Sequence, residues 1–169
     1  MDRKALEAEG FDLARLSDTQ LLRLRSMIDR EGARRGLALT VGEIGERLVI
    51  ETFRDRPDLP ILMPAPRGTK NVDALSRDGD RYSIKTLVRA RKTGTVYPDD
   101  DPERQLFEYL VIVVLSEELN LVQMVVLDWR QFCDVRSWDR RMQAWYVARS
   151  RRVFDKGRCL FPVEPVGDA

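Results

Sequence analysis

Two long apolar runs constrain the fold of this chain more than any other feature. The first run is the segment 107–115, FEYLVIVVL, and the second is the segment 121–127, LVQMVVL. Nearly continuous apolar runs of this kind are typical of strands that are buried on both faces of a sheet. The segment 116–120, SEELN, separates the runs and favours a turn, so we expect the two strands to pair antiparallel.

Two amphipathic helices are expected before these strands. Ser17 is a suitable start for the first helix, and apolar residues then follow helical spacing until Gly32 and Gly36 interrupt it. Thr40 is a good N-cap for the second helix, whose apolar stripe continues to Phe53. The first helix carries no residues that we can assign to chemistry. We therefore expect it to cover the core or a partner subunit.

The rest of the chain predicts an α/β domain. The segment 61–63 is expected to form a short strand, a hairpin follows it, and Trp129 begins a short helix after the buried strands. The segment 89–103 contains a glycine, two prolines and three consecutive aspartates, which predicts an irregular surface loop. The segment 137–154 is expected to mix helix with a short edge strand. The order helix, strand, hairpin, strand, strand, helix predicts a mixed sheet.

Length and charge bound the organisation of the chain. At 169 residues with 43% hydrophobic content, it has the size of one domain with a small helical attachment. We divide it into an N-terminal helical extension, residues 1–38, and a main domain, residues 39–169. The 29 basic and 28 acidic side chains leave a net charge of +1. The overall charge therefore says little about partners.

The absence of histidine excludes whole classes of mechanism. No His-dependent triad and no His-ligated zinc site can form in this chain. The two cysteines, Cys133 and Cys159, lack metal-ligand spacing and are expected to be reduced packing residues. The amino terminus lacks the apolar stretch of a secretion signal, and no run is long enough to span a bilayer. We therefore expect a cytoplasmic protein without a membrane partner.

The predicted hairpin carries an acid and a lysine whose relative placement depends on its register. A three-residue loop that ends at Gly79, with this glycine in the left-handed conformation, places Asp73 opposite Ser83 and Lys85 one diagonal step away on the same face. A two-residue turn instead places Asp73 opposite Ile84, on the other face from Lys85. Both registers remain open from the sequence alone.

The three-residue loop is favoured by the apolar residues of the hairpin. In that register Val72, Ala74, Tyr82 and Ile84 share one face, which a helix can cover. Asp73 and Lys85 then share the opposite face. An acid and a lysine on one sheet near a helical acid can hold a metal ion beside a phosphate, which indicates a nuclease.

The order and spacing of these motifs resemble the PD-(D/E)xK phosphodiesterase superfamily, to which many restriction enzymes belong. The resemblance covers roughly residues 40–127 and rests on the helix motif 42–46, GEIGE, on 71–73, NVD, and on 82–85, YSIK. Bacterial domains of this superfamily that carry a GExGE helix and a Val-Asp-Ala hairpin are the most similar. The resemblance implies a restriction-endonuclease-like mixed central sheet that is flanked by helices.

The resemblance also implies roles for individual residues. Asp73 would be the central metal ligand, Glu46 the helical acid, and Lys85 the residue that positions or helps to activate the attacking water. The carbonyl of Ile84 would be a further ligand. Magnesium, or manganese in its place, suits such a site because it prefers oxygen ligands and keeps several waters.

One position departs from the family pattern. The family usually has an acid two residues before the lysine, where this chain has Ser83, a neutral and weaker ligand. Ser83 therefore takes the fourth catalytic position beside Asp73, Lys85 and Glu46. Glu43, one turn before Glu46, is a candidate to compensate as a metal ligand. Without such compensation the domain would bind DNA and not cut it, as degenerate members of the superfamily do.

The same residues also have structural interpretations. Asp73 can cap a turn or pair with Arg81, and Lys85 can flank an exposed strand end. Both glutamates of the helix can form ordinary pairs with Arg47, an interpretation that we favour for Glu43.

Basic residues predict where a phosphate backbone would lie. The candidates for DNA contact are Lys70, Arg89, Arg91, Lys92, Arg151 and Arg152. A solvated basic face is the alternative. Trp138, Trp145 and Tyr146 lie beside basic residues and resemble a base-stacking surface, although we favour a core role for them.

The sequence as a whole predicts a metal-dependent DNA endonuclease that attacks a phosphodiester with a metal-activated water. Restriction, repair or defence against mobile DNA would be its setting. We expect it to act as a homodimer, since one site cuts one strand, or as a subunit of a defence or repair complex. The alternative is a catalytically inactive module of the same fold that binds DNA or another protein.

Overall fold

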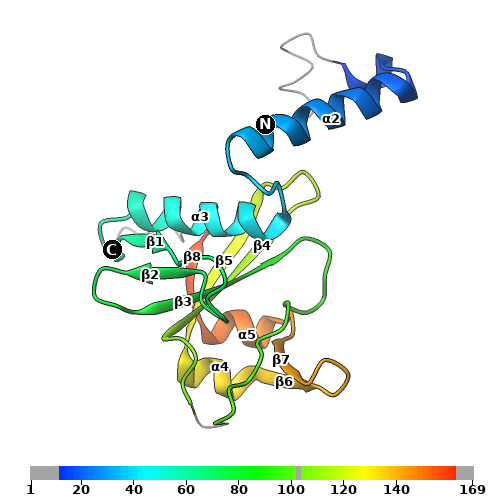
Figure 1. Cartoon of the computed structure of the whole chain (residues 1–169). Helices are drawn as coiled ribbons and strands as arrows, with labels where there is room; N and C mark the ends of the chain where they lie inside the picture. Colours follow the sequence, from blue (N-terminus) through cyan, green and yellow to red (C-terminus); the bar gives the residue numbers. More distant parts are fainter. Residues whose placement is uncertain (1–11, 102–103, 163–169) are drawn as a thin grey trace, which may run out of the picture.

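A computed structural model describes residues 12–101 and 104–162 and shows an α/β arrangement around one six-stranded sheet (Figure 1). The helical elements are η1 (Leu13–Arg15, a 3-10 helix), α2 (Asp18–Arg34), α3 (Val41–Asp55), α4 (Trp129–Val135) and α5 (Arg151–Lys156). The strands are β1 (Leu62–Pro64), β2 (Ala74–Ser76), β3 (Arg81–Leu87), β4 (Tyr109–Leu115), β5 (Leu121–Asp128), β6 (Arg136–Asp139), β7 (Ala144–Val147) and β8 (Arg158–Phe161).

The large sheet has the strand order β1-β2-β3-β4-β5-β8. Strands β3 and β4 pair in parallel, and the other pairs of this sheet are antiparallel. The sheet is therefore mixed, as predicted. The two apolar runs form β4 and β5, and the amide of Ser116 donates to the carbonyl of Asn120 in the turn between them. The expected antiparallel pair is confirmed, with β4 buried from Leu110 to Leu115.

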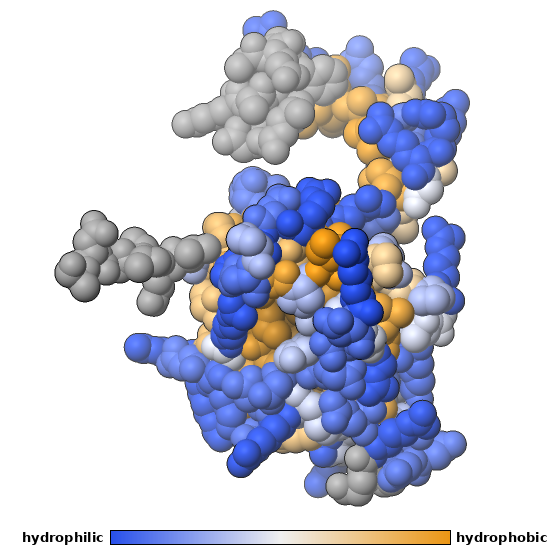
Figure 2. Space-filling view, turned by 90° about the vertical axis from the view of Figure 1, so that its left-hand side faces the viewer, coloured by the Kyte–Doolittle hydropathy of each residue, from blue (hydrophilic) through white to orange (hydrophobic). Residues whose placement is uncertain are grey.

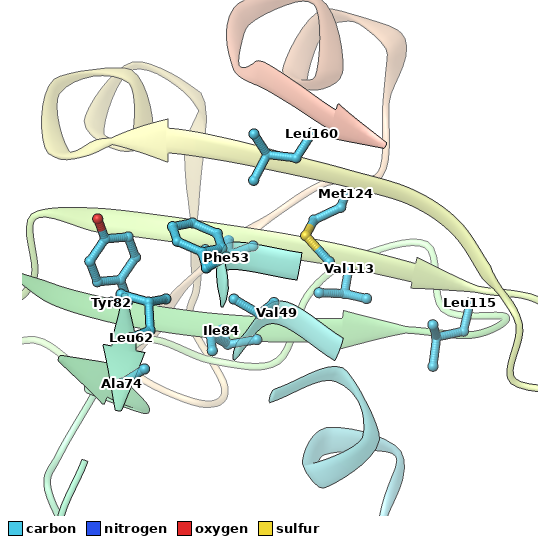
Figure 3. Packing of buried hydrophobic residues seen from close by; sticks show 11 residues of the cluster. Val49, Phe53, Leu62, Ala74, Tyr82, Ile84, Val113, Leu115, Met124 and Leu160 are labelled. Atoms are coloured by element: carbon cyan, nitrogen blue, oxygen red, sulfur yellow. The ribbon is translucent and has the colours of Figure 1, made fainter. Parts of the chain in front are cut away.

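One face of the sheet is covered by α3. Val49 and Phe53 of this helix pack against Tyr82 and Ile84 of β3 (Figure 3), and the Phe53 and Tyr82 rings meet edge to face at 5.5 Å. Thr40 caps the helix by accepting from the amide of Glu43, as expected for an N-cap at this position. The apolar side of α3 that the sequence predicts therefore contributes to the core cluster on this face of the sheet.

The other face of the sheet is covered by α4, α5 and the two-stranded sheet β6–β7 (Figure 1). Phe132, Val147 and Val153 supply the covering side chains. They form a second core cluster with residues from β3, β4 and β5, namely Leu87, Leu110, Ile112, Val114 and Leu127. Strand β4 contributes to both clusters, which explains why its sequence is apolar at nearly every position.

The hairpin adopts the three-residue loop. Ala74 pairs with Tyr82, and Leu75 pairs with Arg81. The same register, continued by one residue, places Asp73 opposite Ser83. Gly79 has a φ of +92°, in the left-handed region that the predicted bulge requires. The favoured register is confirmed and the two-residue turn is wrong.

The C-terminal third was predicted least well. The expected mixture over 137–154 contains the hairpin β6–β7, and β8, which completes the large sheet beside β5, was not predicted. The segment 89–103 is not wholly a surface loop, because Val96 is buried and exchanges backbone hydrogen bonds with Trp145 of β7. The structure of these segments depends on pairing with strands that are distant in the sequence.

Helix α2 lies away from the sheet (Figure 1). Ser17 and Gln20 form a capping box at its start, as the sequence predicts for Ser17 as the N-cap. Gly32 is its only buried residue in the described chain. Over that same described chain, none of the helices has the length and apolar character needed to cross a bilayer.

Candidate active site

Asp73 lies at the point where the chain enters β2. Its amide donates to the carbonyl of Tyr82 at 2.8 Å, and its carbonyl accepts from the amide of Ala65 at 2.9 Å. Its carboxylate oxygen Oδ2 accepts from the amide of Ile84 at 2.6 Å and from the hydroxyl of Ser83 at 3.4 Å. The backbone and the side chain of Asp73 are therefore both held by neighbouring strands, and the carboxylate is directed towards β3.

Lys85 shares the face of Asp73, as the favoured register predicts. Its Nζ lies 3.6 Å from Asp73 Oδ2, with the side chains 17% and 25% exposed respectively. A Cβ atom at Gly94 would lie 3.9 Å from Lys85 Cδ, so the backbone at Gly94 lies beside the lysine stem. The ammonium is thus placed beside the carboxylate in a partly buried setting. An ordinary exposed strand end would leave Lys85 in solvent.

Glu46 reaches the same place from α3. Burial raises the pKa of Glu46, the negative charge of Asp73 raises it further, and the positive charge of Lys85 lowers it. Glu46 and Asp73 also line one cavity of about 420 Å³. The helical acid and the sheet acid therefore share one cavity, and the lysine lies beside the sheet acid.

Helix α3 can place Glu46 there because the preceding residue is glycine. A Cβ atom at Gly45 would lie 1.8 Å from Thr86 Oγ1, and 2.9 Å from the Cβ of the same threonine. Such distances are shorter than any real contact, so only glycine lets the helix approach β3 this closely. The hydroxyl of Thr86 is buried under the helix and has no hydrogen-bond partner within the described residues.

Glu43 has structural partners. Its Oε2 accepts from the amides of Ala38 at 2.6 Å and Leu39 at 3.0 Å, and its Oε1 accepts from Arg47 Nη2 at 3.1 Å. The guanidinium of Arg47 is the main cause that lowers the pKa of Glu43. The pairing with Arg47 that we favoured is confirmed. Glu43 anchors the linker between α2 and α3, and its role as a metal ligand stays a prediction.

Ser83 and Ile84 contribute to the site mainly by orienting Asp73. Ser83 is fully buried and brings no negative charge. Ile84 offers its amide to Asp73, and the role of its carbonyl as a ligand stays a prediction. Among the described residues, no group of three or more acidic or cysteine side chains is placed to hold a metal ion. Glu43 and Glu51 line the same cavity as Asp73 and Glu46.

The loops beside the site are joined by Asn71, which belongs to the motif 71–73 but received no role in the sequence analysis. Asn71 Nδ2 donates to the carbonyl of Tyr97 at 2.7 Å, and Asn71 Oδ1 accepts from the amide of Tyr97 at 3.1 Å. Asn71 has a φ of +60°, a conformation that asparagine tolerates better than most residues. That tolerance is a sequence signal for a turn at this position. Arg67, which was also missed, lines the cavity of Glu46 and Asp73.

Two of the predicted DNA-contacting residues lie close to these loops. Lys70 Nζ donates to the carbonyl of Pro98 at 2.9 Å. Lys92 Nζ pairs with Asp139 at 2.8 Å and lies 4.5 Å from the centre of the Tyr146 ring. Both ammonium groups already have partners, so a phosphate would have to compete with or add to these contacts.

The other basic candidates are more dispersed. Arg89 forms an ion pair with Glu117, and Arg151 forms one with Asp155 at 3.4 Å. Arg91 and Arg152 are exposed. Helix α5, which carries Arg151, leads into β8 at the opposite edge of the sheet from β1. The structure therefore does not gather the six candidates into one patch.

The aromatic residues of the β6–β7 hairpin are partly structural. Trp138 and Trp145 meet at 4.6 Å, and the guanidinium of Arg136 lies 4.0 Å from the centre of the Trp145 ring. Trp145 packs against the second core cluster, which agrees with the favoured core interpretation, whereas Trp138 is exposed.

Comparison with known proteins does not extend this description. No protein-family model matches the chain, and the search of curated proteins finds no match. The residues of the site and their geometry are therefore the basis for a functional proposal.

Proposed function

We propose that this chain is a metal-dependent DNA endonuclease with a restriction-endonuclease-like fold of the PD-(D/E)xK type. The observation that carries the proposal is the convergence of two carboxylates and an ammonium group from different elements. Lys85 Nζ lies 3.6 Å from Asp73 Oδ2, and the charges of both residues act on Glu46. The mixed sheet and the helix that covers it agree with such a fold.

The donor chemistry of the site fits Mg²⁺ or Mn²⁺. Asp73 and Glu46 would hold the ion together with solvent and a phosphate oxygen of the substrate, because Mg²⁺ prefers oxygen ligands and keeps several waters. The ion would supply charge stabilisation at the phosphate and a water of lowered pKa.

The residues of the chain have separate tasks in this proposal. Within the described chain the hydrogen bonds and the ion pair of the Asp73 carboxylate fall on Oδ2, which leaves Oδ1 for a ligand. The ammonium of Lys85 would contact a phosphate oxygen and stabilise the charge that develops during the attack of water. Ser83 and the Ile84 amide hold the Asp73 carboxylate in place. No covalent enzyme intermediate is required.

A plasmid-nicking experiment tests the proposal. Supercoiled plasmid is incubated with Mg²⁺ or Mn²⁺ and with the wild-type chain, Asp73→Ala or Lys85→Ala, and nicked and linear products are quantified. We expect cleavage by the wild-type chain and a loss of at least about 100-fold in both variants, because each removes charge stabilisation of the transition state. The matched control is Asp78→Ala, which removes an exposed carboxylate from the β2–β3 turn and should leave cleavage unchanged. Cleavage that persists in Asp73→Ala would contradict the proposal.

A second candidate function is a DNA-binding or protein-interaction module without catalytic activity. Ser83 favours it, because a buried neutral side chain stands where the family usually has an acid. In the same assay this module would bind plasmid in a gel shift and would not nick it with either metal. Binding that falls equally in Lys70→Ala and Lys92→Ala would place DNA at the loops beside the site.

The biological setting of the endonuclease would be restriction, repair or defence against mobile DNA. One site cuts one strand, so a break in both strands requires two copies of the chain or a partner enzyme. We therefore propose a homodimer or a subunit of a larger complex as the working form.

A further inference from the structure

Helix α2 presents an apolar face that its own domain does not cover. Leu21, Met27 and Ile28 are 40%, 63% and 52% exposed, and Gly32 is the only buried residue of the helix in the described chain. Figure 2 shows hydrophobic surface on the part of the molecule that lies beyond the sheet. Contiguous exposed apolar surface of this kind marks an interaction site.

A cavity of about 460 Å³ opens on the same face of the helix. Its lining comes from the second half of α2 and from the linker that follows, namely Leu24, Met27, Ile28, Glu31, Gly32, Arg35, Leu37 and Leu39. The side chain of Leu39 fills the space beside Gly32, where a Cβ atom would lie 2.6 Å from Leu39 Cδ1. Apolar residues make up most of the lining, beside the charged Glu31 and Arg35, and such a cavity suits an apolar occupant.

We propose that the occupant is Leu21 of a second copy of this chain, and that α2 forms the antiparallel interface of a homodimer. Leu21 lies one turn before Leu24 on the same helix face, and it does not line the cavity of its own chain. A twofold axis level with Met27 reverses the second helix and brings its Leu21 next to Gly32 of the first. Each copy then supplies one protruding leucine and one cavity, as an isologous interface requires.

The charges beside the apolar face select the antiparallel arrangement. Arg25 and Asp29 lie one turn apart on one flank of that face, with Arg25 Nε 3.8 Å from Asp29 Oδ2. The same twofold axis places Arg25 of each copy opposite Asp29 of the other, which gives two attractive pairs. A parallel pair in register would oppose like charges at both positions. The charges at the helix ends also favour the antiparallel arrangement. Asp18 begins α2 and Arg34 ends it, so the acidic start of one helix lies near the basic end of the other.

This interface does not depend on the proposed nuclease activity, and sedimentation velocity tests it directly. We expect the wild-type chain to sediment with twice the mass of one chain. The double variant Leu24→Glu/Ile28→Glu should sediment as a monomer, with the dimer Kd raised at least about 100-fold by charges buried in an apolar interface. The matched control Ser26→Glu introduces the same carboxylate at an exposed position on the side of the helix away from the apolar face, and this variant should remain a dimer.

Charge exchange provides a second test that does not disturb the apolar face. Arg25→Glu and Asp29→Arg each oppose like charges in their own dimer, so each should weaken the dimer. An equimolar mixture of the two variants restores both attractive pairs between unlike copies, while the pair within each helix stays broken. We therefore expect the mixture to recover the dimer. A monomeric wild-type chain, a dimer that survives Leu24→Glu/Ile28→Glu, or a mixture no tighter than its parts would each overturn the proposal.

Discussion

The two faces of β3 use neighbouring residues for opposite tasks. Tyr82 and Ile84 face α3 and are buried among apolar side chains. Ser83 and Lys85 face the other way, where Ser83 donates a hydrogen bond to the carboxylate of Asp73 and Lys85 forms an ion pair with it. The first face stabilises the fold by apolar burial. The second keeps ionised groups close together in a partly buried place. Polar chemistry and core packing are therefore separated by a single residue step along one strand.

The contrast predicts a large loss of stability on the apolar face. Phe53→Ala should lower the free energy of unfolding by about 3–5 kcal/mol, because the ring packs against Tyr82 and would leave a cavity. Urea denaturation followed by circular dichroism measures the change. The matched control is Phe161→Ala, which removes the same ring from an exposed site and should cost less than about 1 kcal/mol. Equal losses in the two variants would contradict the core assignment.

A smaller effect is expected where helix and strand approach most closely. Gly45→Ala should destabilise the chain by about 1–3 kcal/mol, because the added methyl group meets Thr86 and pushes the helix from β3. Gly42→Ala, on the same helix, meets only Thr40 Oγ1 at 3.9 Å and should stabilise the chain by up to about 1 kcal/mol. Thermal unfolding of both variants measures the difference. The comparison fails if the two alanines shift the melting temperature in the same direction.

The smallest effect is expected at the site, and its sign is opposite to that in the core. Burial and Asp73 raise the pKa of Glu46, so folding favours its protonated form and the ionised form destabilises the native state. Wild-type stability should therefore fall as the pH rises through the pKa of Glu46 in the folded chain. Glu46→Gln removes this charge and should be more stable than the wild-type chain near neutral pH, by on the order of 0.5 kcal/mol after solvent screening.

The pH dependence separates this explanation from a general effect of glutamine. The advantage of Glu46→Gln should disappear below the ordinary glutamate pKa of 4.5, where both chains are neutral at this position. Glu51→Gln, at an exposed position of the same helix, should show no such pH dependence. Denaturant unfolding over a pH series measures both variants. A gain that is constant with pH would refute the electrostatic cause.

Much of the site could be predicted because its signals are local. The alternation of apolar residues and the left-handed preference of glycine at position 79 favoured the register that places Asp73 and Lys85 on one face, and the structure adopts it. Ser17 and Thr40 predicted the starts of α2 and α3, because N-capping involves only residues that are close in sequence. The convergence of Glu46 with the sheet residues followed from a resemblance, since the docking of a helix on a strand is not encoded within either segment.

What could not be predicted depends on contacts between distant segments. Strand β8 is short and becomes a strand by pairing with β5. Val96 is buried because β7 lies beside it, although its neighbours in the sequence indicate a loop. The bridge from Asn71 to Tyr97 likewise joins residues 26 positions apart. Such features require knowledge of tertiary packing, which overrides local preference.

The missing side chain at Gly45 has a consequence for the spacing of the two carboxylates. Glu46 follows it directly, so the depth at which α3 rests on β3 also sets how far the two carboxylates stand from each other. A larger residue at position 45 would collide with Thr86 and push α3 away from β3, which would widen that separation. In the proposed enzyme, position 45 would thus influence the distance between two candidate ligands without touching the ion.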